Sequence, residues 1–205
     1  MGAPPERHYV PHLVAALGVL FTADALGTAF APMLAVRAPL LLIALSPLGR
    51  HLVLVAGDTS MPAFVAIASA RRLLAFAVIY FLARAYGENA FAWVERRYAR
   101  MGRLARAFER AFRRAAPLVI VLLPGMSAPM AGATGMPPRA YFSLAGIAAV
   151  GWVVVAYLVG DALSAWTAPV LAFVRAHIAS TTAVCVVAVL LYEWRRRARR
   201  RASAR

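Results

Sequence analysis

Hydrophobic residues occur along this chain in long runs, and short stretches between the runs hold most of the charges. The runs cover about 13–36, 39–57, 62–86, 117–136, 140–165 and 167–192. Each run approaches or exceeds the roughly 20 apolar residues that a helix needs to cross a bilayer. The pattern predicts an all-α membrane protein, a polytopic helical bundle in which residues 1–194 form a single transmembrane domain.

Two of these runs, 39–57 and 117–136, are interrupted where a spanning helix should be most regular. The interruptions are made by prolines and glycines: Pro47, Gly49, Pro124, Gly125 and Pro129. Proline removes a backbone donor, and in lipid an unsatisfied backbone group costs several kcal/mol. Broken backbone is therefore tolerated only inside protein or beside a water-filled cavity, and transporters place substrate sites in such segments. The alternative is an ordinary kinked helix.

Composition supports the membrane setting, and charge orients the chain. Hydrophobic residues make up 62% of the sequence, more than the apolar share of soluble domains. All 23 basic residues are arginines, against 8 acidic residues. Nucleic-acid binding is excluded because the arginines concentrate in two blocks beside apolar runs, 96–114 and 195–205, as the positive-inside rule describes. Both blocks are expected in the cytoplasm.

The two basic blocks also limit the topology. Between them the chain must cross the membrane an even number of times, and the runs 140–165 and 167–192 account for two crossings. The broken run 117–136 is therefore predicted to enter and leave on the cytoplasmic side. The same reasoning makes 39–57 a re-entrant hairpin that opens outward, with crossing helices at 13–36 and 62–86. The result is an inverted-repeat arrangement whose two hairpin tips meet near the midplane, with both termini cytoplasmic.

Three further segments complete the expected organisation. Residues 91–114 alternate apolar and basic positions at helical spacing, which predicts an amphipathic helix on the cytoplasmic leaflet. Residues 195–205 are predicted to be a disordered Arg-rich tail. Cys185 is the only cysteine and is expected to be a small buried hydrophobe. No His, Cys and acid cluster has metal-ligand spacing, so neither a metal nor another cofactor is expected.

Several motifs between residues 39 and 165 occur in a characteristic order. They are Ser46-Pro47-Leu48-Gly49-Arg50 with Ala56-Gly57; Tyr80 to Gly87; and Leu123-Pro124-Gly125-Met126-Ser127 with Ala131-Gly132, Met136, Phe142, Gly151-Trp152 and Gly160. In order and spacing they resemble the DedA family, whose fold is also called the VTT or SNARE-associated domain. The resemblance implies a bacterial inner-membrane protein with two opposed re-entrant hairpins. It also implies movement of phospholipids or lipid-linked phosphates between leaflets, without a cofactor.

The chain departs from the family at its charged positions. Val121 and Ser127 stand where the family has two arginines around the second hairpin's proline. Arg50 stands where the first hairpin usually carries a glutamate, and Phe76 lies near an expected acidic position. The family's scheme of proton coupling is therefore not expected for this chain.

The arginines inside apolar runs are the candidate binding residues. Arg50, Arg71 and Arg72 would each cost at least about 2.5–3.5 kcal/mol in the membrane interior, so each should face a cavity, an acid or a ligand. Arginine's planar fork suits phosphate. We expect Arg50 to meet an anionic headgroup, supported by Ser127 and by backbone N–H groups around Gly125. The alternatives are an ion pair of Arg50 with Asp58 or Asp161, and an interfacial position for Arg71 and Arg72.

The expected function is the binding or translocation of an anionic lipid or lipid-linked phosphate, in a chain that is not an enzyme. A homo-oligomer is compatible with the sequence. The main alternative is a non-transporting scaffold or assembly factor of the same fold. A remote alternative is an intramembrane serine hydrolase, because Gly125-Met126-Ser127-Ala128 is similar to the Gly-x-Ser-x motif of rhomboid-type proteases. Its general base would be His177, which we instead expect near the outer surface.

Overall fold

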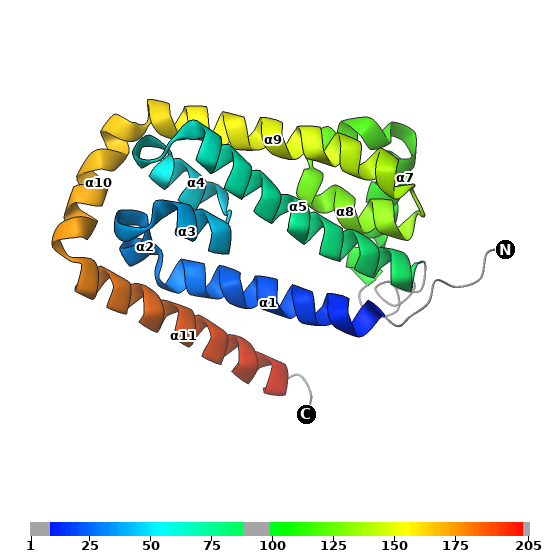
Figure 1. Ribbon diagram of the computed structural model, residues 1–205. Coiled ribbons are helices and arrows are strands. Elements are labelled where there is room, and N and C mark those ends of the chain that lie inside the picture. Colours follow the sequence, from blue (N-terminus) through cyan, green and yellow to red (C-terminus); the bar gives the residue numbers. More distant parts are fainter. Residues whose placement is uncertain (1–8, 88–98, 203–205) are drawn as a thin grey trace. The chain divides into compact units, whose positions relative to one another are not determined.

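The computed structural model describes residues 9–87 and 99–202 (Figure 1). These residues form helices joined by short turns, and no strand occurs among them. The helices are α1 (Val10–Ala29), α2 (Ala31–Arg37), α3 (Pro39–Leu45), α4 (Gly49–Val55), η2 (Ala56–Asp58), α5 (Met61–Tyr86), α7 (Ala99–Leu122), α8 (Pro124–Ala133), α9 (Pro138–Ala162), α10 (Ser164–Ala176) and α11 (Ile178–Ala202).

Three helices, α1, α5 and α9, are long and apolar enough to cross a membrane, and a fourth span results if α10 and the apolar part of α11 count as one. Their apolar surface faces outward: only 11% of the apolar window of α1 is buried. Large exposed side chains include Val19, Phe21, Ile147 and Val184. Soluble monomers rarely expose so much contiguous apolar surface. The predicted all-α membrane fold is therefore confirmed at this level, whereas the re-entrant course of the hairpins stays a prediction.

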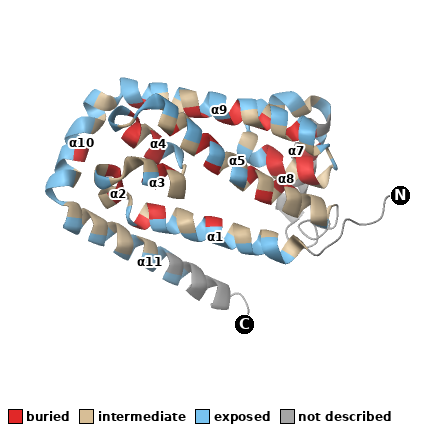
Figure 2. Ribbon diagram, in the orientation of Figure 1, coloured by how far each residue is buried: buried red, intermediate tan, exposed pale blue. Residues whose placement is uncertain are grey.

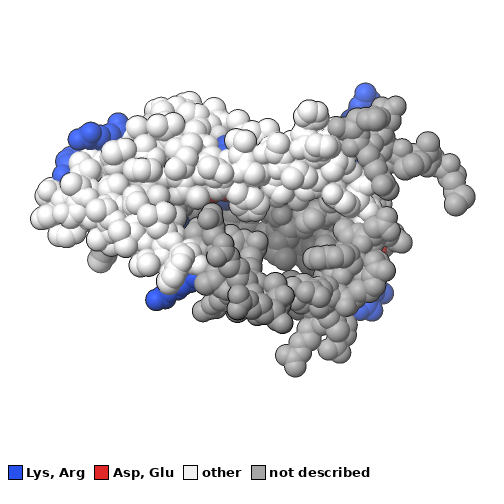
Figure 3. Space-filling model, turned by 90° about the horizontal axis from the view of Figure 1, so that it is seen from below, with Lys and Arg blue, Asp and Glu red and all other residues white. Residues whose placement is uncertain are grey.

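Charge is scarce on the exposed helix faces. On the face that Figure 3 shows, uncharged residues cover nearly all of the described surface, and arginine patches are few. Buried residues instead gather on the short helices α3, α4 and α8 and along one side of α5 and α9 (Figure 2). The helices thus bury one face of each broken segment and leave the apolar faces of the long helices exposed.

The chain divides into two compact units. The first unit comprises Met1–Val19 and Arg72–Trp152, and the second comprises Leu20–Arg71 and Val153–Arg205. Each unit contains one of the two interrupted runs, so each is described by itself.

In the second unit, α3 and α4 pack on each other and on α2, and α2 also contacts α10 and α11. The core of this unit lies around the two short helices. Its buried members are Leu34, Ala35, Leu42, Ile43, Leu52, Val55, Ala56, Phe64, Ala68, Val153 and Leu171. One face of the interrupted run 39–57 is therefore buried in this core, whereas Leu41 and Leu48 are exposed.

In the first unit, α7 packs on α8, and both bury apolar side chains against α5 and α9. The core consists of Phe76, Tyr80, Phe112, Ile120, Ala128, Ala131, Tyr141, Ala145 and Ala149. Helix α7 is kinked at Ala115, whose φ of −139° and ψ of 43° are not helical. The kink separates the arginine-rich residues from the apolar ones and lies in the turn before Pro117, which lacks a backbone N–H and clashes with the preceding turn of a helix.

Two of the predicted spans are interrupted in the structure. The run 13–36 is divided at Phe30 into α1 and α2, and Pro32 lies in the first turn of α2, where its missing N–H is harmless. The run 167–192 is bent by 95° at His177, between α10 and α11. The bend exposes Arg175 and His177, which would be costly inside a continuous span.

The C-terminal tail also differs from the expectation. Helix α11 continues to Ala202, so residues 195–202 are helical where the composition predicted disorder. Arginine is a good helix former, and no proline or glycine ends the helix after Tyr192. Residues 203–205 lie outside the described part of the chain. So do residues 91–98 of the predicted amphipathic helix, whose remaining residues 99–114 belong to α7.

Candidate functional site

The interruption at Pro47 leaves backbone carbonyls without helical partners inside the second unit. Pro47 drives the residue before it out of helical geometry, and Ser46 has φ −141° and ψ 90°. Leu48 is extended as well, with φ −68° and ψ 141°, before α4 begins at Gly49. Helix α3 therefore ends with its last carbonyls unpaired by helix geometry, as every helix end does. In an apolar surrounding these carbonyls need donors from elsewhere.

Arg71 of α5 supplies those donors. Its Nε donates to the carbonyl of Ala44 at 3.1 Å, and one terminal nitrogen, Nη2, donates to the carbonyl of Leu45 at 3.3 Å. The same nitrogen reaches the carbonyl of Leu20 at 3.2 Å and the Asp24 carboxylate at 3.5 Å. The Arg71 side chain is only 9% exposed. It therefore acts as a C-terminal cap for α3, with Asp24 as its counter-charge.

Helix α1 presents one face to this break. Asp24, Gly27 and Thr28 are three and four residues apart, so they lie on the same side of the helix. A side chain at Gly27 would place its Cβ 2.7 Å from the Cβ of Ser46 and 3.1 Å from that of Leu45. Only glycine permits this approach. The Ser46 hydroxyl is fully buried and has no hydrogen-bond partner within 3.5 Å.

Arg50 and His51 complete the cluster from the first turn of α4. His51 is 4% exposed, and its Nδ1 lies 3.2 Å from the Ser46 carbonyl. Arg50 donates from Nε to the His51 Nε2 at 3.3 Å and from Nη2 to the Thr28 hydroxyl at 3.4 Å. Both histidine contacts are satisfied together only when Nδ1 carries the proton and Nε2 accepts, which is the neutral imidazole.

The cluster carries a net positive charge. Arg50 and Arg71 are cationic, Asp24 is anionic and His51 is neutral, which leaves one uncompensated positive charge. In this cluster, Arg71 pairs with Asp24 at 3.5 Å, and Arg50 forms no ion pair within 4.0 Å with the described residues. The exposed Arg50 therefore has no carboxylate at that distance, and neither Asp58 nor Asp161 pairs with it.

The remaining predicted site residues belong to the first unit. Pro124 is the first residue of α8, and Pro129 lies inside that helix without ending it. The buried Ser127 hydroxyl donates to the Pro124 carbonyl at 2.8 Å, as expected of a hydroxyl that satisfies broken backbone. A Cβ at Gly125 would meet only Phe76, at 4.0 Å. Arg72 is half-buried and forms no hydrogen bond with the described residues.

The first unit contains its own arginine-supported turn after α8. Arg84 donates to the Tyr80 hydroxyl at 2.8 Å and to the Met136 carbonyl at 3.1 Å, and Tyr80 also donates to that carbonyl. A Cβ at Gly132 would collide with the Tyr80 carbonyl oxygen, so α8 and α5 meet backbone to backbone here. The structure therefore gives Arg84 a structural contact at the end of the second interrupted run.

Comparisons with protein-family models, with curated proteins and with solved structures found no match to this chain. Of the predicted binding residues, Arg50 and Arg71 come together in one cluster, and Arg72, Gly125 and Ser127 lie in the other unit. Asp24, Thr28, Ser46 and His51 are members of the cluster that the sequence did not single out as site residues.

Proposed function

We propose that this chain is a membrane protein that binds an anionic lipid or lipid-linked phosphate at the first hairpin break and moves it between leaflets. The observation that supports the proposal most strongly is the exposed Arg50 guanidinium, which lacks an acidic partner in a cluster of net positive charge. In an apolar surrounding an unpaired cation is costly, and a headgroup phosphate would neutralise it.

The contacts of Arg50 leave its guanidinium group available to bind a phosphate. It donates from Nε and from one terminal nitrogen, Nη2, to two neutral acceptors, His51 and Thr28, at 3.3 and 3.4 Å. These are long contacts, and the other terminal nitrogen has no hydrogen bond to the described residues. Charge-assisted contacts to phosphate are shorter and about twice as strong as neutral ones. A phosphate can therefore bind Arg50 with the Thr28 hydroxyl turned to donate to it.

Arg71 is assigned a different role in this proposal. Its Nε and Nη2 donate to carbonyls and to Asp24, and the side chain is only 9% exposed, so it holds the break in shape. The proposal thus separates two arginines that the sequence placed in one group. Arg50 binds the headgroup, and Arg71 positions the hairpin.

Lipid binding by the purified full-length protein tests the proposal. In native mass spectrometry with phosphatidylglycerol and phosphatidylcholine, wild type should retain the anionic lipid preferentially. Arg50→Gln should weaken retention of phosphatidylglycerol by roughly tenfold or more, since a hydrogen bond to a charged group contributes about 1.5–3 kcal/mol. The matched control is Arg37→Gln, which removes an equal charge from an exposed position at the end of α2.

Equal loss in the two variants would mean that net charge alone attracts the lipid, and the Arg50 site would be refuted. Wild type without any preference for the anionic lipid would favour the scaffold alternative. Retained binding in Arg50→Gln with normal folding would identify Arg50 as a structural residue only.

A further inference from the structure

A polar cavity lies in the second unit, away from the cluster around Arg50. It has a volume of about 210 Å³. Its walls come from the end of α4, η2 and α10, and they include Leu54, Gly57, Asp58, Thr167, Leu171 and Arg175. None of these residues belongs to the cluster around Arg50, so the inference below does not depend on the proposed function.

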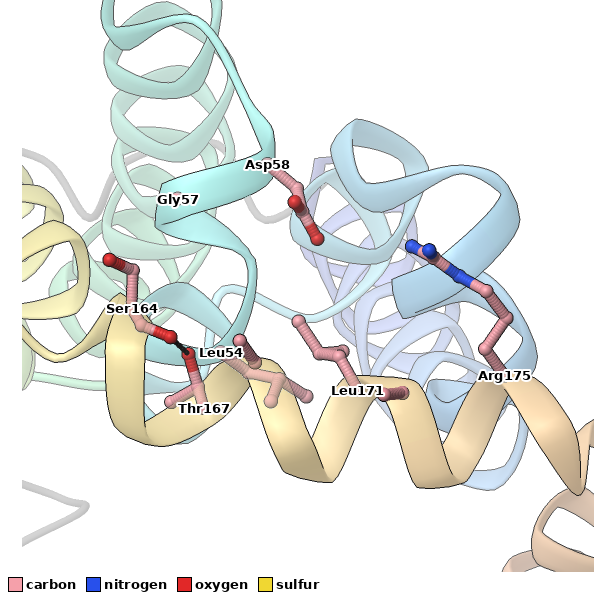
Figure 4. Close-up of a pocket in the computed structure, with 9 residues that line it drawn as sticks. Leu54, Gly57, Asp58, Ser164, Thr167, Leu171 and Arg175 are labelled. Carbon is pink, nitrogen blue, oxygen red and sulfur yellow. Dashed lines mark hydrogen bonds between the residues drawn. The ribbon is translucent and has the colours of Figure 1, made fainter.

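Two opposite charges face each other across this cavity. Figure 4 shows the Asp58 carboxylate and the Arg175 guanidinium pointing toward one another from η2 and α10. They are farther apart than the 4.0 Å limit of an ion pair. Both side chains are exposed and have no hydrogen bond to the described residues. The space between them is therefore bounded by an anion at one end and a cation at the other.

The floor between the two charges is apolar. Leu171 is only 8% exposed, and Leu54 beside it is half-buried. In Figure 4 the side chains of Leu54 and Leu171 lie along α10 between Thr167 and Arg175. A ligand that fits this lining carries a cationic group, a short hydrocarbon spacer and an anionic group.

The cavity lies where the spanning helices end. Helix α5 begins at Met61, just after Asp58, and α9 ends at Ala162, just before α10. The Tyr157 hydroxyl donates to the Thr59 carbonyl at 3.1 Å, which ties these two ends together. Trp166 on α10 is 80% exposed, and tryptophan is enriched at the level of lipid headgroups. These positions place the cavity, and any ligand bound in it, at the level of the lipid headgroups.

We propose that this cavity binds a small zwitterion that carries an ammonium group and an oxyanion, either free or as a lipid headgroup. The ammonium binds the Asp58 carboxylate, the oxyanion binds the Arg175 fork, and the spacer lies on Leu171. Phosphoethanolamine has this chemistry and serves as the probe. The two sources share the same contacts, so the experiment has to distinguish them.

Calorimetric titration of the full-length protein in detergent provides the first test. Wild type should bind phosphoethanolamine saturably and should bind glycerol phosphate and ethanolamine, which each lack one charge, at least tenfold more weakly. Because this comparison needs no variant, it decides the question even if a substitution prevents folding. Equal affinity for phosphoethanolamine and for either probe that lacks one of its two charged groups would overturn the proposal.

Two substitutions should change the discrimination in opposite ways. Asp58→Asn should remove the preference for phosphoethanolamine over glycerol phosphate, and Arg175→Gln should remove the preference over ethanolamine. Asp161→Asn is the matched control, because this exposed acid at the end of α9 does not line the cavity. Unchanged discrimination in Asp58→Asn and Arg175→Gln would refute the assignment.

The source of the ligand follows from the same titration in lipid nanodiscs. If the headgroup is the ligand, phosphatidylethanolamine in the disc should compete with free phosphoethanolamine, whereas phosphatidylglycerol should not. Equal affinity in both discs would assign the cavity to a free zwitterion. Arg50→Gln should leave all of these titrations unchanged, so failure here and failure of the anionic-lipid proposal are distinguishable.

Discussion

Replacement of Arg71 by methionine should destabilise the protein far more than the same replacement of its neighbour, Arg72. Arg71 donates to the last two carbonyls of α3, those of Ala44 and Leu45, at 3.1 and 3.3 Å. No backbone N–H in the described residues outside regular helix bonding takes its place. The substitution Arg71→Met would leave both carbonyls without a donor in a half-buried region.

The size of the effect follows from those two carbonyls. A buried acceptor without a partner costs about 1–3 kcal/mol, so two of them cost roughly 2–6 kcal/mol. The Arg71 side chain is 9% exposed, so water replaces little of the loss. We leave out any gain from the Asp24 pair, because Asp24 is 39% exposed and the pair is long at 3.5 Å. Arg72→Met should change the free energy of unfolding by less than about 1 kcal/mol.

Equilibrium unfolding in mixed micelles, followed by tryptophan fluorescence, would measure both variants in parallel. Arg71→Lys provides an intermediate case, because lysine keeps the charge and loses the planar fork that reaches two carbonyls. The reasoning is refuted if Arg71→Met and Arg72→Met lower the free energy of unfolding equally. It is refuted as well if Arg71→Met unfolds like wild type.

Three further predictions follow. Gly27→Ala should cost about 1–3 kcal/mol of stability, because its Cβ would lie 2.7 Å from that of Ser46, whereas Gly146→Ala, with nothing within 4 Å, should be neutral or mildly stabilising in the same unfolding assay. In a Cys185→Ala background, single cysteines at positions 37 and 59 should both react with an impermeant thiol reagent from outside, and those at positions 114 and 139 should both react from inside. Labelling from opposite sides of the membrane within either pair would contradict the predicted hairpins. A peptide of residues 91–114 should bind anionic vesicles, and replacing Arg103, Arg106, Arg110 and Arg113 by glutamine should weaken this binding as high salt does; equal binding to neutral vesicles would show that the arginines serve orientation alone.

Local signals predicted the long helices and the places where helices break. The apolar runs 62–86 and 140–165 correspond closely to α5 and α9, because length and hydropathy are sufficient to recognise a span. Pro47 and Pro124 lie at the interruptions because a proline changes the backbone wherever it stands. The bend at His177 has no proline or glycine beside it, so the same reasoning could not find it.

The sequence could not predict every member of the polar cluster, because the residues that contact one another are far apart in the chain. Arg71 and Asp24 are 47 residues apart, and Arg50 and Thr28 are 22 apart. One usable signal was present: an acid within an apolar helix is rare and requires a partner. Asp24 is the only carboxylate in α1, and Arg71 is one of three candidate cations. Choosing Arg71 over Arg50 required the fold, because α3 and α4 place the carbonyls of the break.

The central claim is that Arg50 carries an anionic headgroup, and lipid movement tests it most directly. Proteoliposomes with a fluorescent phosphatidylglycerol in one leaflet would be prepared with wild type, Arg50→Gln and the control Arg37→Gln at equal protein density. Chemical quenching of the outer leaflet then reports how much lipid has moved. The account predicts movement by wild type and by Arg37→Gln, and movement at the level of protein-free vesicles for Arg50→Gln. Movement by Arg50→Gln at the wild-type rate, or none by wild type, would contradict it.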